Sequence, residues 1–216
     1  MDHLVPPLLR PLLRPLPWWA VLSAVVAPAA LIGGWLYAGA SVSGYDPVRQ
    51  PISDLAAGDA PGRWVMTVAL VVTGIAHVVT AVGLRPADGV GRSILGVGGV
   101  ATLIGAWIPN THVGHNYVGH MIVTYMGFAA LSLWPAVIAR NVTGAPLVLR
   151  PTFGKSLAIT LGVLVLITVA DIVTGGATLG FRERLATSAQ AVTPLLVVLG
   201  LVRIPVRSLP EPLLHP

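Results

Sequence analysis

Three of the six histidines of this chain fall within nine residues, at His112, His115 and His120. Imidazole titrates near physiological pH and binds zinc or iron as a neutral ligand, so these side chains are candidate acid/base groups and candidate metal ligands. His115 and His120 are five residues apart, which places them about 140° apart on a helix rather than on one face. The spacing leaves a zinc site, an acid/base site and an ordinary exposed loop all open.

Three acidic residues lie beside or inside apolar stretches, namely Asp54, Asp171 and Glu183. An ionisable side chain in a membrane-spanning helix is costly, so it indicates either function or a buried partner. The structural alternative for Asp171 is an ion pair with Arg182 or Arg184, and for Glu183 it is a favourable place near a helix N-terminus. The candidate catalytic residues are Asp54, His115, His120, Asp171 and Glu183.

Two patterned segments are candidates for binding a substrate. The stretch 44–55 contains Tyr45, Asp46 and Ser53 and is more patterned than a connecting loop requires. Its structural alternative is two turns and a short helix capped by Ser53 or Asp54. The second segment contains the arginine pair, and because paired arginines hold carboxylate or phosphate well, a lipid headgroup is a plausible ligand. The candidate substrate-binding residues are Tyr45, Asp46, Ser53, Arg182 and Arg184.

His77 stands apart from the other histidines, about thirteen residues and therefore about 20 Å into an apolar stretch. We interpret it as a side chain that hydrogen-bonds between packed helices. The alternative is a haem ligand, but ligation by two histidines needs a partner at the same depth, and no other apolar stretch carries a histidine near its middle.

The elements that must position these residues are membrane spans. The chain has 216 residues, of which 55% are hydrophobic and 10% are charged, and its mean hydropathy is +0.82. A spanning helix needs about 20 mostly apolar residues. The sequence therefore predicts an all-α membrane protein, a six-transmembrane-helix bundle, with helices near residues 18–40, 63–84, 91–108, 118–139, 156–175 and 185–202.

The distribution of basic residues predicts the orientation of the bundle. Nine of the 13 lysines and arginines fall on one side of the predicted spans, which puts both termini in the cytoplasm of a multi-pass protein of the cell membrane. We expect a cytoplasmic Pro-rich tail over 1–17, the membrane domain over 18–203 and a second cytoplasmic tail over 204–216. The basic residues are scattered, so the net charge of +5 does not indicate nucleic-acid binding. The loops that carry the candidate residues then face outward.

Glycines are frequent in the third predicted helix, where Gly91, Gly98 and Gly105 recur at seven-residue intervals. Small residues at such spacing allow membrane helices to approach closely. Cysteine is absent, which excludes disulfides, thiolate metal sites and cysteine nucleophiles.

The motifs together resemble a bacterial six-helix integral membrane family, catalogued as domain-of-unknown-function family 998. The resemblance is carried by Gly44-Tyr45-Asp46 and 50–55, by His115 and His120, and by 182–185. Members of that family commonly have a glutamate where Asp54 stands here. The resemblance implies the topology and the site, but no activity.

We carry three functions forward. The first is an enzyme acting on a membrane lipid or isoprenoid-like substrate, either a zinc-dependent hydrolase or a metal-free cyclase. The second is a non-enzymatic partner or sensor protein, and the third is a haem-binding electron carrier. The enzyme hypothesis predicts that the five candidate catalytic residues converge in one cavity at the outer leaflet. The sequence does not predict the oligomeric state.

Overall fold

The computed structural model describes residues 15–115, 117–139 and 145–202. Six helices are long and apolar enough to cross a membrane, as predicted, and the chain is a multi-pass membrane protein. Most of the 1–17 tail and all of the 204–216 tail lie outside the described residues. The spanning helices are α1 (Trp18–Ser41), α3 (Arg63–Gly83), α4 (Gly89–Trp107), α5 (Val118–Val137), α6 (Pro151–Thr174) and α7 (Leu179–Val202).

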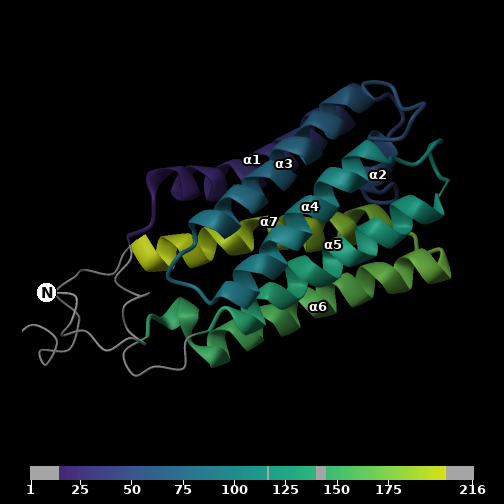
Figure 1. Ribbon diagram of the computed structural model, residues 1–216. Helices are drawn as coiled ribbons and strands as arrows, with labels where there is room; N and C mark the ends of the chain where they lie inside the picture. The colour runs from purple at the N-terminus through teal and green to yellow at the C-terminus, as the bar shows by residue number, and fades with distance from the viewer. Residues whose placement is uncertain (1–14, 116, 140–144, 203–216) are drawn as a thin grey trace, which may run out of the picture.

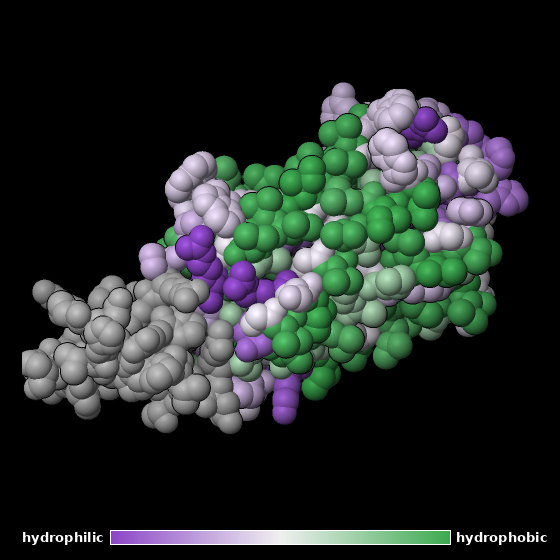
Figure 2. Space-filling view, in the orientation of Figure 1, coloured by the Kyte–Doolittle hydropathy of each residue, from purple (hydrophilic) through white to green (hydrophobic). Residues whose placement is uncertain are grey.

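Helices that follow one another along the chain pack side by side, and α7 returns to contact both α1 and α6 (Figure 1). A short helix, α2 (Ile52–Leu55), and a 3-10 turn, η2 (Leu147–Leu149), complete the described elements. The segments 42–62, 108–115 and 175–178 lie at the same end of the bundle, which we call the histidine end. Apolar side chains cover the body of the bundle and polar ones gather toward its ends, as a membrane span requires (Figure 2).

Close helix packing depends on glycine, as the spacing predicted. A Cβ atom at Gly91 would lie 2.8 Å from the backbone nitrogen of Ile138, and one at Gly98 would lie 2.6 Å from Leu131. Gly105 differs, because a Cβ there would meet nothing within 4 Å. The seven-residue repeat therefore does not have one purpose, since its last glycine borders a cavity instead of another helix.

Three predicted boundaries were wrong. Helix α6 begins at Pro151 rather than near Ser156, since proline is well tolerated in a first helical turn. Helix α7 begins at Leu179 rather than near Leu185, so the charged run 182–184 is helical. The N-cap position of α2 is Pro51, not Ser53 or Asp54.

The buried apolar side chains form two clusters. One surrounds Trp134, away from the histidine end, and the other surrounds Ile52 and Met66 at the histidine end. Leu131 of the first cluster and Leu31 of the second both border the same internal cavity. The apolar core is thus divided by an opening at the level where the predicted polar residues enter the bundle.

Candidate functional site

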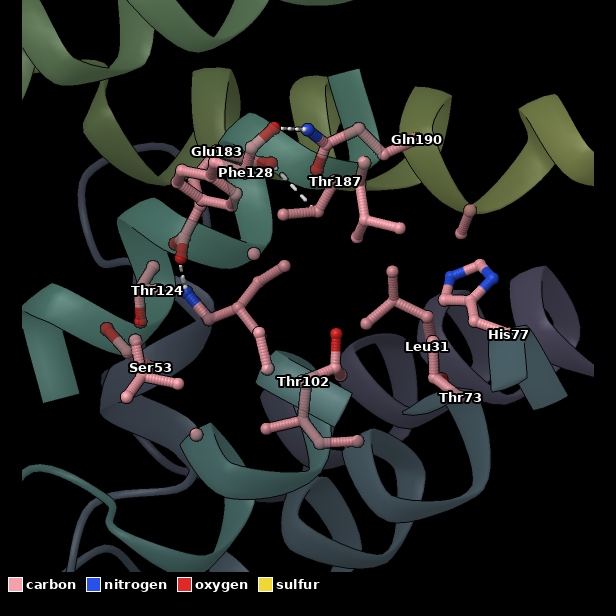
Figure 3. Close-up of a pocket in the computed structure, with 18 of the residues that line it drawn as sticks. Leu31, Ser53, Thr73, His77, Thr102, Thr124, Phe128, Glu183, Thr187 and Gln190 are labelled. Atoms are coloured by element: carbon pink, nitrogen blue, oxygen red, sulfur yellow. Dashed lines mark hydrogen bonds between the residues drawn. The ribbon is translucent and has the colours of Figure 1, made fainter. Parts of the chain in front are cut away.

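The cavity lies among α1, α3, α4, α5 and α7 and is closed on one side by α2 (Figure 3). It has an empty volume of about 730 Å³, counted out to its open side. Most of the surface of its wall is apolar, although nine of the 19 lining residues carry a polar side chain. Its ionisable lining residues are His77, His120 and Glu183. The cavity therefore suits a largely apolar molecule that carries a few polar groups.

A polar stripe on α7 runs along the cavity wall. Glu183, Thr187 and Gln190 stand at positions i, i+4 and i+7, which lie on one face of a helix. The amide nitrogen of Gln190 donates to the carbonyl of Phe128 and to the hydroxyl of Ser132, each at 2.9 Å. Sequence reasoning missed Thr187 and Gln190, although this spacing of polar residues in a span was a signal that could have found them.

Glu183 stands between this cavity and a second one. The second cavity, of about 480 Å³, lies between α5, α6 and α7 and shares Ser53, His120, Thr124, Phe128 and Glu183 with the first. One carboxylate oxygen of Glu183 accepts a 2.6 Å hydrogen bond from the Ile52 amide of α2. Among the described residues, no lysine or arginine forms an ion pair with it. Glu183 is thus a partly buried acid whose free side is open to a ligand.

His120 lies in the first turn of α5 and is buried. Its Nδ1 is 3.1 Å from the carbonyl oxygen of Ile108, which can only accept a hydrogen bond. Nδ1 therefore carries the proton, which leaves Nε2 as the nitrogen of the neutral ring that can accept a proton. Because this ring lines both cavities, His120 supplies a proton-accepting atom at the same level as Glu183.

His77 is buried, with 1% of its surface exposed, and it lines the first cavity. The hydrogen bond that we expected between helices is missing at Nδ1, which has no partner. The neighbouring helix approaches through Gly99, whose missing side chain offers no acceptor for the ring. The close packing that we expected is present, but the expected polar contact is not.

Asp171 faces the protein interior, as predicted, and its partner is an arginine. Arg182 donates to Asp171 at 2.7 Å, and the Thr178 hydroxyl donates to the other carboxylate oxygen at 2.9 Å. Asp171 does not line either cavity. The ion pair joins α6 to the start of α7, which is the structural role that we weighed for it.

Arg184 is buried and fastens the 44–50 loop to α7. Its guanidinium donates to the carbonyls of Pro47 and Gln50 at 2.9 Å and to that of Gly180 at 2.8 Å. It also donates to the Tyr45 hydroxyl and lies 5.3 Å from the ring centroid of Trp35. Both arginines of the predicted binding pair thus use their charge within the protein.

Tyr45 and Asp46 shape the same loop. The Tyr45 hydroxyl donates to the carbonyls of Gln50 and Pro51, and burial raises the pKa of Tyr45 to about 12. A carboxylate oxygen of Asp46 accepts from the Val48 amide at 2.9 Å. Neither residue lines a cavity, whereas Ser53 lines both.

Two acids hold the histidine loop, residues 108–115, against the first loop. Asp54 accepts from the Gly114 amide at 3.1 Å, and Asp59 accepts from the Val113 amide at 2.9 Å. Burial raises the pKa of Asp54, whereas the bond from Val113 lowers the pKa of Asp59. Asp59 also lies 3.2 Å from His112 Nδ1.

The three metal candidates do not assemble into a site. His115 is exposed, with its ring centroid 6.0 Å from that of His112, while His120 is buried in α5. Within the ranges that the structure describes, no group of three or more histidine, cysteine or acidic side chains is placed to hold a metal ion. The geometry therefore gives no ligand set on which zinc chemistry could be built.

The sequence matches, over residues 25–200, the family described as "Protein of unknown function (DUF998)". The chain belongs to this family. The resemblance drawn from the loop motifs is confirmed, and the six apolar helices suit a membrane family. No curated protein and no solved structure matches the sequence. The function of this DUF998 protein must therefore be argued from its site.

Of the five candidate catalytic residues in this DUF998 protein, the cavities bring together His120 and Glu183. Asp54 and Asp171 are buried nearby in contacts of their own, and His115 is exposed. The remaining pair combines a carboxyl group with a neutral imidazole acceptor in an apolar setting. Such a pair can give a proton at one atom of a bound molecule and remove one at another.

Proposed function

We propose that this protein is a membrane-embedded enzyme that carries out acid/base chemistry on a lipid or isoprenoid-like substrate bound in the cavity. The observation that carries the proposal is Glu183, a partly buried carboxyl group that lines both cavities and forms no ion pair among the described residues. Burying a charge is costly unless it is paired, so such a group needs either a proton or a complementary ligand beside it. A proton on this carboxyl group, and a ligand beside it, both favour proton transfer between Glu183 and a bound molecule.

In the proposed reaction, the Glu183 carboxyl group gives its proton to an electron-rich atom of the substrate, and His120 Nε2 removes a proton from a neighbouring atom. One proton is added and one is lost, so the product is an isomer or a cyclised form of the substrate. Exchange with water restores both residues. We assign Asp54 and Asp171 to holding the surrounding segments, through the contacts with Gly114 and Arg182.

We place this chemistry at the outer leaflet of the cell membrane. The excess of basic residues on the other side of the spans supports that orientation. The second cavity, between α5, α6 and α7, supports entry of a substrate from the bilayer, because α6 has the least buried surface of the spanning helices.

Isotope incorporation tests the proposal without knowledge of the substrate. Membranes that contain the protein are incubated in deuterated water, and the extracted lipids are compared by mass spectrometry with those from membranes containing Glu183→Gln. We expect at least one lipid to gain a deuterium only with the unchanged protein. A parallel incubation in ¹⁸O-water reports hydrolysis, which would add ¹⁸O to a product instead.

The matched control is Asp59→Asn, which also removes one carboxylate at the histidine end but at an exposed position outside both cavities. It should incorporate deuterium as the unchanged protein does. If neither isotope enters any lipid, while a lipid still co-purifies with the protein, the acid/base proposal is wrong and the sensor hypothesis takes its place.

A further inference from the structure

The end of the cavity that lies away from Glu183 has a polar group of its own. His77 stands there opposite Ser53 and Glu183, and Thr73 and Gln190 are its polar neighbours (Figure 3). The His77 ring is almost completely buried, and its Nδ1 has no hydrogen-bond partner. A buried polar group without a partner calls for an explanation.

The other polar side chains at this end already donate their hydrogens in hydrogen bonds within the protein. The Thr73 hydroxyl donates to the Ala69 carbonyl at 2.7 Å, and the Thr102 hydroxyl donates to the Gly98 carbonyl at 2.9 Å. Both N–H groups of the Gln190 amide are donated, to Phe128 and Ser132. Toward the cavity these three side chains therefore offer only acceptor oxygens.

His77 is then the donor at this end. A neutral imidazole carries its proton on one nitrogen, and an orphaned buried N–H is rarer than an orphaned acceptor. Nδ1 is buried in the cavity wall and has no hydrogen-bond partner, so we assign the proton to Nε2. The ring faces the cavity, so an N–H group is directed at whatever lies there (Figure 3).

The charge of the lining limits the ligand further. No lysine or arginine of the part of the chain that the structure describes lines the cavity, and Arg182 and Arg184 are held by Asp171 and by loop carbonyls. A phosphate or carboxylate at the His77 end of the cavity, which we call the deep end, would therefore find no cation.

The length of the cavity can be judged along α7. Glu183 and Gln190 are seven residues apart, which separates them by about 10 Å along the helix axis.

We infer that His77 is a ligand-binding residue whose Nε2–H donates to a hydroxyl or carbonyl oxygen at the deep end of an uncharged, elongated, largely apolar ligand. A hydroxyl group there can also donate to the acceptor oxygens of Thr73 and Gln190. The other end of the ligand lies about 10 Å away, beside Glu183. This inference rests on the proposed function, because it names the substrate class of the same cavity.

The test uses the full-length protein in lipid nanodiscs with ¹⁵N-labelled histidine. The probes are farnesol and farnesene, which share a fifteen-carbon isoprenoid chain but differ in the hydroxyl group. We expect the ¹⁵N spectrum of the free protein to show His77 protonated on Nε2, and farnesol, but not farnesene, to shift that resonance. His77→Phe should weaken farnesol binding about tenfold, as for one lost hydrogen bond, and leave farnesene binding unchanged.

His77→Gln is the second variant, because its amide restores an N–H donor and should recover most of the farnesol affinity. The inference is overturned if His77 is protonated on Nδ1, if His77→Phe weakens both probes equally, or if neither probe binds. Failure of the proposed function alone gives a different result. Farnesol would then shift the ¹⁵N resonance of His77 in both the unchanged protein and Glu183→Gln, but no isotope would enter any lipid.

Discussion

Two sides of the first turns of α7 differ in how completely their ionisable groups are paired. On the side that faces α6, Arg182 and Thr178 donate to both carboxylate oxygens of Asp171. On the side that faces the cavities, Glu183 has a single donor from α2 and empty volume beyond it. A charge with a complete set of partners stabilises the bundle, whereas an acid beside empty volume is available to a ligand.

The helix itself creates this difference. Consecutive residues of an α-helix point about 100° apart, so Arg182, Glu183 and Arg184 reach three different neighbours. Arg182 reaches α6, Glu183 reaches the cavities and Arg184 reaches the 44–50 loop. Only Glu183, the middle residue of the run, lines the cavities, and the comparison predicts that the three residues will respond differently to substitution.

The largest expected effect is on activity, at Glu183. Glu183→Gln keeps an oxygen that can accept from the Ile52 amide, but it cannot give or take a proton. We expect isotope incorporation to fall about 100-fold or more, which is typical of losing a general acid, while the apparent melting temperature in detergent changes little. If Glu183→Gln melts much earlier instead, Glu183 is structural and the comparison fails.

Arg184 should show the opposite pattern. Arg184→Ala removes the charged donor that the carbonyls of Pro47, Gln50 and Gly180 share, and only Gln50 keeps another side-chain donor, the Tyr45 hydroxyl; lost hydrogen bonds to a charged group are costly. We expect a loss of about 3 kcal/mol or more of stability, seen as a low yield of folded protein and early melting. Near-normal stability would show that the 44–50 loop is held by other contacts.

The Asp171 and Arg182 pair should have a smaller and purely structural effect. Arg182 is 39% exposed at its side chain, so water weakens the interaction, and we expect Asp171→Asn to cost about 1 to 2 kcal/mol. A double-mutant cycle with Arg182→Gln measures the coupling between the two residues. Isotope incorporation measured in folded protein should persist in all three variants, and its loss in Asp171→Asn would return Asp171 to the catalytic site.

Much of this arrangement could be predicted from the sequence. Apolar stretches of sufficient length predict six spans, because a bilayer imposes that length on every crossing helix. The interior partner of Asp171 could be predicted too, since a carboxylate near the end of a span needs a cation, and the nearest candidate along the chain, Arg182, follows 11 residues later, at the start of the next span.

The cavity itself could not be predicted. Its existence depends on where five helices leave space, and the same seven-residue glycine spacing that closes the contact at Gly98 borders open volume at Gly105. His115 and His120 looked alike as neighbours in the sequence, but the start of α5 between them leaves one exposed and buries the other. Which of two similar residues meets a cavity is decided by tertiary packing.

Two glycines of α4 extend the comparison from charges to volume. Gly105→Leu places a side chain in open space at the cavity, so it should block ligand binding while stability changes by less than about 1 kcal/mol. Gly91→Ala is the control, because its methyl group would lie 2.8 Å from the backbone nitrogen of Ile138, away from both cavities, and should cost about 1 to 3 kcal/mol. Farnesol binding in nanodiscs and melting in detergent separate the two outcomes.

The smallest expected effect distinguishes the two acids that hold the histidine loop. Burial raises the pKa of Asp54 above its ordinary value of 3.8, so the folded state binds this proton more tightly than the unfolded state does. Its contribution to stability is therefore full below that value and is lost as the pH rises through the raised pKa. Asp59 has a lowered pKa, so its contribution is present above its ordinary pKa and is lost as the pH falls through the lowered value.

Asp54→Asn keeps an oxygen for the Gly114 amide and removes the ionisation, so near neutral pH it should equal or exceed the unchanged protein in stability by up to about 1 kcal/mol. The difference should shrink as the pH falls through the raised pKa, because Asp54 regains its proton in the folded state. Asp59→Asn should instead lower the melting temperature near neutral pH, with the gap closing in acid. Melting curves between pH 2 and 8 measure both variants. If Asp54→Asn is instead less stable than the unchanged protein at every pH, the charge of Asp54 stabilises the histidine loop. Its role would then be like that of the Arg182 and Asp171 charges, which join α6 to α7.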